Sequence, residues 1–162
     1  MSQILREIDG SILVLKLNRP EKQNALTREM YQELANAINE AHGDFGVRAA
    51  VITTTSKHFT AGNDLFDFLN EPPIEPGSPV MNFLEAIHNF AKPLIAAVSG
   101  NAVGIGTTML LHCDYVTAHP ETRFSMPFVS LGLVPEAGSS LDRKSTRLNS
   151  SHVSESRMPS SA

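Results

Sequence analysis

The chain has 162 residues, of which 41% are hydrophobic and 19% are charged, so it has the length and composition of one globular domain. This excludes a disordered acidic tail, a collagen-like repeat and a disulfide scaffold. The net charge of −4 provides no field that would attract a phosphate backbone, and we expect no nucleic-acid partner. The single cysteine, Cys113, cannot form an internal disulfide and is interpreted as a buried small residue.

The N-terminal third of the chain predicts a hairpin followed by a helix. The first ten residues lack the basic start and apolar core of a signal peptide, so we expect a cytoplasmic location by default. Apolar runs at 4–8 and 11–17 flank Asp9-Gly10, which is a strong hairpin signal. Thr27 can cap a helix that ends near His42. The apolar stripe of this helix consists of Met30, Leu34, Ile38 and Ala41.

The middle of the chain alternates strands and helices, which predicts an α/β fold. The expected strands are 49–54, 94–98, 115–118 and 123–125. The expected helices begin at Asp64, Pro79 and within the turn 100–106, and a proline-rich surface loop covers 71–79. The apolar stretch 94–111 is long enough to raise the question of a membrane span. Its three glycines and its polar residues favour a buried strand, turn and helix instead, so no membrane partner is expected.

Composition changes after Leu141. The segment 142–162 has seven serines in 21 residues and no helical or strand period, which is typical of a disordered tail. Its first eleven residues, DRKSTRLNSSH, and its later SRMPSSA resemble, in order, one reading frame of a common sequencing-library adapter. We therefore expect a natural domain over 1–141 and a non-native tail over 142–162. Codons in the source DNA of this tail that differ from the adapter would contradict this expectation.

Two loops that contain glycine have the same place in the predicted fold, between a strand and a helix. The loop 60–64 follows one expected strand, the loop 100–106 follows another, and each leads toward a helix start. Backbone N–H groups at helix starts have no partner within the helix, and two of them converging on one oxygen would form an oxyanion hole. Glycine-rich turns before helices also serve as packing devices, and the spacing leaves both interpretations open.

Five blocks of the sequence resemble the crotonase superfamily, the enoyl-CoA hydratases and isomerases. They are NRPEKQNAL (18–26), HFTAGNDL (58–65), KPLIAAVSGNAVGIG (92–106), CDYVTA (113–118) and TRFSMPFVSLGLVPEAGSS (122–140). The resemblance implies an α/β, ClpP/crotonase-like spiral of ββα units with two sheets. It also implies a C-terminal helical region, missing here, that helps relatives to form trimers. A homotrimer or hexamer is therefore expected for the full-length protein.

Carried over by position, this resemblance assigns the oxyanion donors to the backbone N–H groups of Asn63 and Ile105. It implies that an acyl-CoA is the substrate and that coenzyme A is not a separate cofactor. The residues implied to line the substrate path are Lys22, Ala25, Leu26, Thr60, Ala61, Gly62, Asp64, Leu65, Gly104, Phe128, Leu131 and Pro135. Two alternatives stay open from the residues themselves: Lys22 as an exposed surface lysine, and Asp64 as the cap of the next helix.

The carboxylates distinguish the possible reactions. Hydratases of the superfamily use two glutamates, and at those positions this chain has Thr108 and Phe128, neither of which is a general base at neutral pH. Glu136 matches the catalytic glutamate of Δ3,Δ2-enoyl-CoA isomerases, which implies isomerisation of 3-enoyl-CoA to 2-trans-enoyl-CoA. Alternatively, Glu136 stabilises the first turn of a helix. Hydration, thioester hydrolysis and a non-catalytic acyl-CoA binding module remain alternatives.

No metal is expected, because the histidines lack ligand spacing. His58, next to the first loop, is expected to be an exposed loop histidine.

Overall fold

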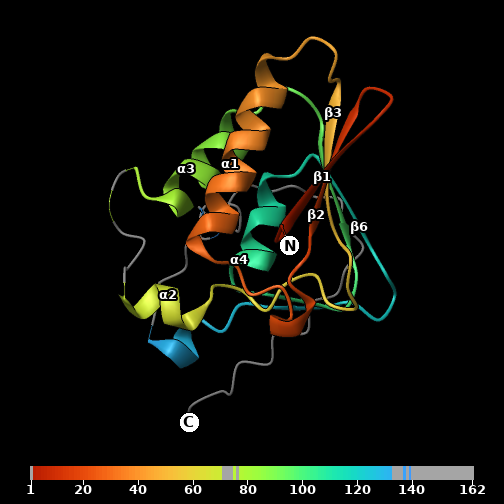
Figure 1. Ribbon diagram of the computed structural model, residues 1–162. Coiled ribbons are helices and arrows are strands. Elements are labelled where there is room, and N and C mark those ends of the chain that lie inside the picture. The colour runs from red at the N-terminus through yellow and green to blue at the C-terminus, as the bar shows by residue number, and fades with distance from the viewer. Residues whose placement is uncertain (1, 71–74, 76, 133–136, 138, 140–162) are drawn as a thin grey trace.

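The computed structural model describes residues 2–70, 75, 77–132, 137 and 139, and its centre is a five-stranded sheet with helices packed on one face (Figure 1). The sheet has the order β1-β2-β3-β4-β6. Its strands are β1 (Ile4–Asp9), β2 (Ile12–Leu17), β3 (Ala49–Thr54), β4 (Leu94–Val98) and β6 (Tyr115–Ala118).

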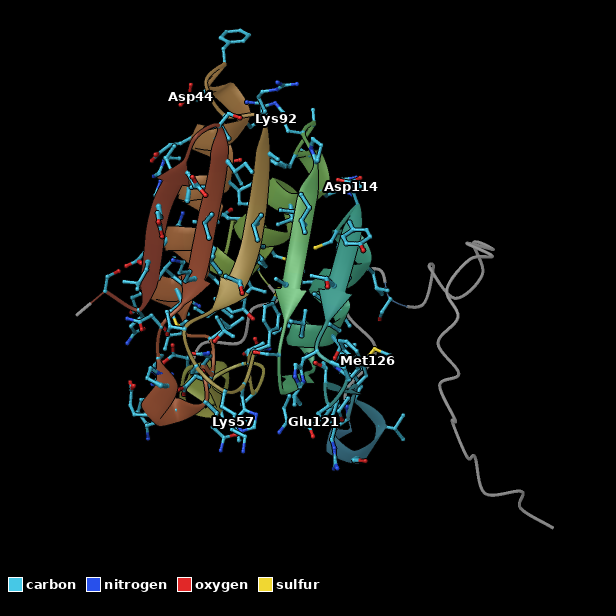
Figure 2. All side chains as sticks on the ribbon, turned by 90° about the vertical axis from the view of Figure 1, so that its right-hand side faces the viewer. Asp44, Lys57, Lys92, Asp114, Glu121 and Met126 are labelled. Carbon is cyan, nitrogen blue, oxygen red and sulfur yellow. The ribbon has the colours of Figure 1, made fainter. Side chains whose placement is uncertain are left out.

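The expected hairpin is confirmed: β1 and β2 are antiparallel, and Gly10 adopts φ +59° in the turn between them. From β2 onward all pairings in this sheet are parallel, so each new strand requires a crossover. As a result, the carboxyl ends of β3, β4 and β6 all lie at one edge of the sheet, where the loops after them meet (Figure 2).

Helices α1 (Arg28–Gly43) and α3 (Pro79–Asn89) pack against each other and cover one face of the sheet. Thr27 Oγ1 accepts a hydrogen bond from Met30 N at 3.3 Å, which confirms the predicted cap. The predicted stripe of α1 is buried, and so are Phe83 and Ile87 of α3 and Phe90 directly after it. The expected start of α3 at Pro79 is confirmed, and the helix ends at Asn89.

The segment after β4 differs from the prediction. A helix that begins within the turn 100–106 was expected, whereas the chain forms β5 (Asn101–Val103), then α4 (Ile105–Thr108) and a 3-10 helix, η2 (Met109–His112). The reason is a long-range pairing: β5 lies parallel to β7 (Arg123–Ser125) in a second, two-stranded sheet. Three residues carry too little periodicity to predict such a strand.

The stretch 94–111 begins with the predicted buried strand, β4, and no helix of the described residues is long and apolar enough to cross a membrane. Cys113 follows η2 with 7% of its surface exposed.

Burial raises the pKa of the Cys113 thiol to about 12. We therefore expect the folded protein to resist a thiol-specific disulfide reagent at pH 8 and to react at once after denaturation. Absorbance of the released thiolate measures this. Rapid reaction of the native protein would contradict the burial of this side chain.

Candidate active site

The two glycine-marked loops lie side by side. Thr60 and Ala102 form a parallel bridge, in which Thr60 N donates to Asn101 O and Val103 N donates to Thr60 O, both at 3.1 Å. On its other side the first loop pairs with the segment before α1. Leu26 N donates to Gly62 O at 2.8 Å, and Asp64 N donates to Leu26 O at 2.9 Å. The structure thus brings together three segments that are far apart in the sequence.

Glycines make the close approach of the two loops possible. A Cβ atom on Gly62, which has φ +95°, would lie 3.0 Å from Val103 O. A Cβ atom on Gly106 would lie 2.3 Å from Thr60 Cγ2. Real Cβ contacts are not this short, so a side chain at Gly106 would push the loops apart.

Two backbone donors at this junction are free. Neither Asn63 N–H nor Ile105 N–H donates to an acceptor in the part of the chain that the structure describes. Asn63 N has no acceptor because the bridge to Leu26 uses the amide of Asp64 instead. Ile105 N has none because it is the first amide of α4, and the first amides of a helix have no partner within the helix. Free donors on two adjacent loops are what an oxyanion hole requires, and these are the two residues predicted for it.

A buried asparagine, which the sequence analysis did not single out, joins the loops. Asn24 is fully buried, with φ +55°, and its Oδ1 accepts from Arg19 N at 2.7 Å. Its Nδ2 lies within 3.0 Å of four acceptors, Thr54 Oγ1, Ser56 Oγ, His58 O and Phe59 O. Its own carbonyl accepts from Thr60 Oγ1 at 2.6 Å. Asn24 therefore ties the 18–26 segment to the first loop; its presence in the NRPEKQNAL block was the only signal.

Arg19 and Asp64 form a largely buried ion pair beside the first loop. Arg19 Nη1 donates to Asp64 Oδ2 at 2.7 Å and to Ala25 O at 2.8 Å. Asp64 Oδ1 accepts from Phe66 N at 3.0 Å, so the carboxylate also caps α2 (Leu65–Asn70), as the alternative interpretation of Asp64 predicted. The Arg19 guanidinium holds the pKa of the Asp64 carboxyl below its usual range.

This ion pair predicts a stability that depends on pH. Because the folded pKa of Asp64 is lowered, the pair stabilises the protein above the ordinary pKa of 3.8 and loses its contribution as pH falls through the folded value. We expect Asp64→Asn, which keeps an oxygen for the cap, to cost about 1–3 kcal/mol of unfolding free energy at pH 7. In urea titrations the difference from wild type should shrink between about pH 5 and pH 3. A constant difference over this range would contradict the lowered pKa.

A tyrosine on α1 holds the side chain of Asn63, the first of the two predicted oxyanion donors. Tyr31 is 2% exposed, and its hydroxyl donates to Asn63 Oδ1. The Tyr31 ring in turn packs on Phe83 of α3, with centroids 5.6 Å apart. Asn63 is thus held by the helical layer through its side chain and by Leu26 through the backbone on either side of it.

The other predicted site residues differ in their placement. Lys22, Ala61 and Leu65 are exposed, whereas Phe128 is buried. Gly104 N donates to Ser125 O at 2.8 Å, which ties the second loop to β7, three residues before Phe128. Leu131 ends the 3-10 helix η3 (Val129–Leu131). Pro135 and Glu136 lie outside the described residues.

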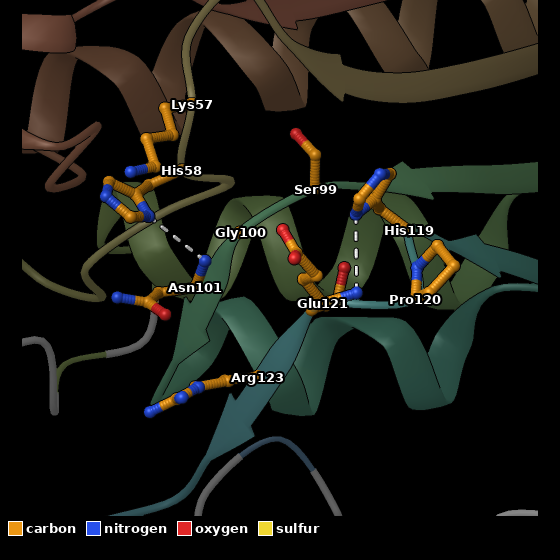
Figure 3. Close-up of a pocket in the computed structure, with 10 residues that line it drawn as sticks. Lys57, His58, Ser99, Gly100, Asn101, His119, Pro120, Glu121 and Arg123 are labelled. Carbon is orange, nitrogen blue, oxygen red and sulfur yellow. Dashed lines mark hydrogen bonds between the residues drawn. The ribbon is translucent and has the colours of Figure 1, made fainter.

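A separate polar cavity of about 770 Å³ lies between the residues just before the first loop, the start of the second loop and the segment 119–123 (Figure 3). Its charged or ionisable lining side chains are Lys57, His58, His119, Glu121 and Arg123. His58 is half-buried, and its Nδ1 accepts from Asn101 N at 3.2 Å. The expectation of an exposed loop histidine is therefore wrong: His58 packs against the turn at Gly100, where a Cβ atom would lie 2.7 Å from its Nδ1.

Within the described ranges, no three His, Cys, Asp or Glu side chains lie close enough to hold a metal ion.

Comparison with known proteins places the chain in a family. The enoyl-CoA hydratase/isomerase family model matches residues 7–149, a range that extends past Leu141. Rat enoyl-CoA delta isomerase 2 is 38% identical over 143 residues, which are 85% of this chain and 36% of that protein. Escherichia coli 2,3-dehydroadipyl-CoA hydratase is 36% identical over 139 residues, 85% of this chain and 54% of that protein.

Solved structures agree with these matches. The structure of Pseudomonas aeruginosa OdaA superimposes with a TM-score of 0.85 at 52% identity, covering 87% of this chain and 57% of that one. The chain thus spans about half the length, or less, of the relatives it matches. The predicted crotonase fold is confirmed, and the chain belongs to the enoyl-CoA hydratase/isomerase family.

Proposed function

We propose that this protein isomerises 3-enoyl-CoA to 2-trans-enoyl-CoA in the degradation of fatty acids or related acyl chains. The paired loops supply the site for the thioester. Its carbonyl oxygen accepts hydrogen bonds from Asn63 N–H and Ile105 N–H, and these donors stabilise the negative charge that develops on that oxygen.

The reaction is a proton transfer within one substrate molecule. Glu136 as carboxylate removes a proton from C2, and the electrons of that C–H bond form a dienolate whose charge rests on the thioester oxygen. Glu136, now a carboxylic acid, returns the proton to C4, and the double bond moves from C3–C4 to C2–C3. The transfer needs one carboxylate and no water.

Isomerisation is favoured over hydration because positions 108 and 128, where hydratases carry glutamates, hold no carboxylate here. Both are buried, and they hold Thr and Phe, so neither can activate a water molecule. The named relatives include hydratases as well as isomerases, so hydration is the competing reaction that the experiment must measure.

The test follows ultraviolet absorbance of the conjugated 2-enoyl thioester. It should use two proteins: the 162-residue chain, and a chain in which the tail 142–162 is replaced by the sequence that follows Leu141 in the natural gene. We expect conjugation to appear with 3-enoyl-CoA, and 2-enoyl-CoA to keep its conjugation. Loss of absorbance from 2-enoyl-CoA would instead establish hydration. Binding without either change would establish a binding module.

A further inference from the structure

A histidine at the end of η2 bonds to the backbone next to the proposed base. His112 is half-buried, and its Nε2 lies 2.9 Å from Ala137 O. A carbonyl oxygen only accepts hydrogen bonds, so Nε2 carries the hydrogen and donates it. Ala137 follows Glu136 directly in the sequence. The hydrogen bond therefore holds the chain one residue beyond the group that the proposed function assigns as the base.

The backbone at Ala137 has an unusual conformation. Its φ is +51°, in the left-handed region that residues with a Cβ atom seldom adopt. Such a conformation persists only where the surrounding structure holds it, and residues of this kind cluster at functional sites. Two contacts of Ala137 are described: the hydrogen bond from His112 and the packing of the alanine side chain against the hydrophobic core. The histidine thus supports a conformation that the chain would otherwise avoid.

The donor is itself held in place by the fold. Leu110 of η2 is buried in the core, and the His112 ring meets the ring of His88 on α3 edge to face, with centroids 6.2 Å apart. Since α4 leads directly into η2, one helical run connects Ile105 to His112. Through this run and the hydrogen bond to Ala137, the proposed oxyanion donor is joined to the backbone beside the proposed base.

We propose that His112 is a positioning residue for Glu136, which fixes the backbone beside this carboxylate relative to the Ile105 N–H. The inference rests on the proposed function, because it takes Glu136 as the base and Ile105 N–H as an oxyanion donor. Isomerisation requires one carboxylate to reach both C2 and C4 while the thioester oxygen stays at its donors. A displacement of about 1 Å in such an arrangement lowers the rate about 10²-fold.

The experiment measures kcat for conjugation of 3-enoyl-CoA in variants of His112, made in the form of the protein that is active in the test of the proposed function. His112→Phe keeps a ring against His88 but has no donor for Ala137 O, and we expect kcat to fall about 10- to 100-fold. Binding of hexanoyl-CoA should stay at the wild-type value, because the thioester is bound elsewhere. His112→Gln, whose side-chain amide can donate from about the position of Nε2, should keep most of the activity.

A second histidine provides the matched control. His42 Nδ1 accepts from Ala91 N at 3.4 Å, and its ring lies against that of Phe90 with centroids 6.2 Å apart. His42→Phe therefore also exchanges a bond between histidine and backbone for a phenyl ring, at the end of α1. Its kcat should equal that of wild type.

A double variant separates positioning from a general loss of structure. Because His112 acts through Glu136 in this proposal, His112→Phe should cause no further loss of rate when it is added to Glu136→Gln. A wild-type kcat in His112→Phe would overturn the inference and leave the proposed function in place. So would an equal fractional loss of rate in both backgrounds, or a loss of hexanoyl-CoA binding. Absence of conjugation by the unsubstituted protein would overturn the proposed function and this inference together.

Discussion

Replacing Glu136 by Gln is expected to lower the rate of conjugation of 3-enoyl-CoA by at least about 10²–10⁴-fold, the contribution of a positioned acid–base group. The amide has nearly the shape of the carboxylate but cannot take the proton from C2. Binding of a saturated acyl-CoA should be retained, because in the proposed mechanism the thioester is held by the backbone donors of Asn63 and Ile105 and not by Glu136. The measurement is the initial rate of absorbance increase at saturating substrate.

The matched control is Glu121→Gln, a glutamate of the polar cavity that lies outside the proposed site. Its rate should equal that of wild type. If the Glu136 variant kept the wild-type rate, the proton transfer would have to be assigned to another group. Loss of both rate and acyl-CoA binding would indicate that Glu136 supports the structure rather than the chemistry.

The second large effect is expected from Gly106→Ala. The new Cβ atom would lie 2.3 Å from Thr60 Cγ2, and Thr60 cannot rotate freely because its hydroxyl donates to Asn24 O and accepts from Gly62 N. The loops must separate, which displaces one of the two proposed oxyanion donors. We expect a loss of about 10²–10³ in kcat and about 1–3 kcal/mol of unfolding free energy.

The double variant Gly106→Ala with Thr60→Ser is the sharpest control. Serine lacks the clashing methyl group and keeps the hydroxyl, so both activity and stability should recover relative to Gly106→Ala. Gly43→Ala, at a position where a Cβ atom meets nothing within 4 Å, should leave both unchanged. If the serine failed to restore activity, the clash would not be the cause of the loss.

Periodicity and turn chemistry predicted most of the fold. The hairpin at Asp9-Gly10, the Thr27 cap and the stripe of α1 depend on residues close in sequence, so local rules suffice for them. The strand β5 was missed because its three residues become a strand only by pairing with β7, about twenty residues away.

The sequence marked the two loops by their glycines, whereas the site role of Asn63 and Ile105 stays a prediction. Gly62 and Gly106 indicated the two loops, and the structure places those loops against each other. The contacts that support these loops were not predictable. Asn24 makes five hydrogen bonds to residues 30 or more positions away, and Tyr31 reaches Asn63 from a position typical of helix core. Such contacts exist only after the chain has folded.

The central claim is that Asn63 and Ile105 polarise a thioester carbonyl. Infrared spectroscopy of hexanoyl-CoA labelled with ¹³C at its carbonyl tests this most directly, because hydrogen bonds to the oxygen weaken the C=O bond and lower its stretching frequency. We predict that the band moves to lower frequency when wild type binds the ligand, and that the shift is reduced in Gly106→Ala and restored by Thr60→Ser. A bound ligand whose carbonyl band stays at the frequency of the free thioester in water would contradict the oxyanion hole.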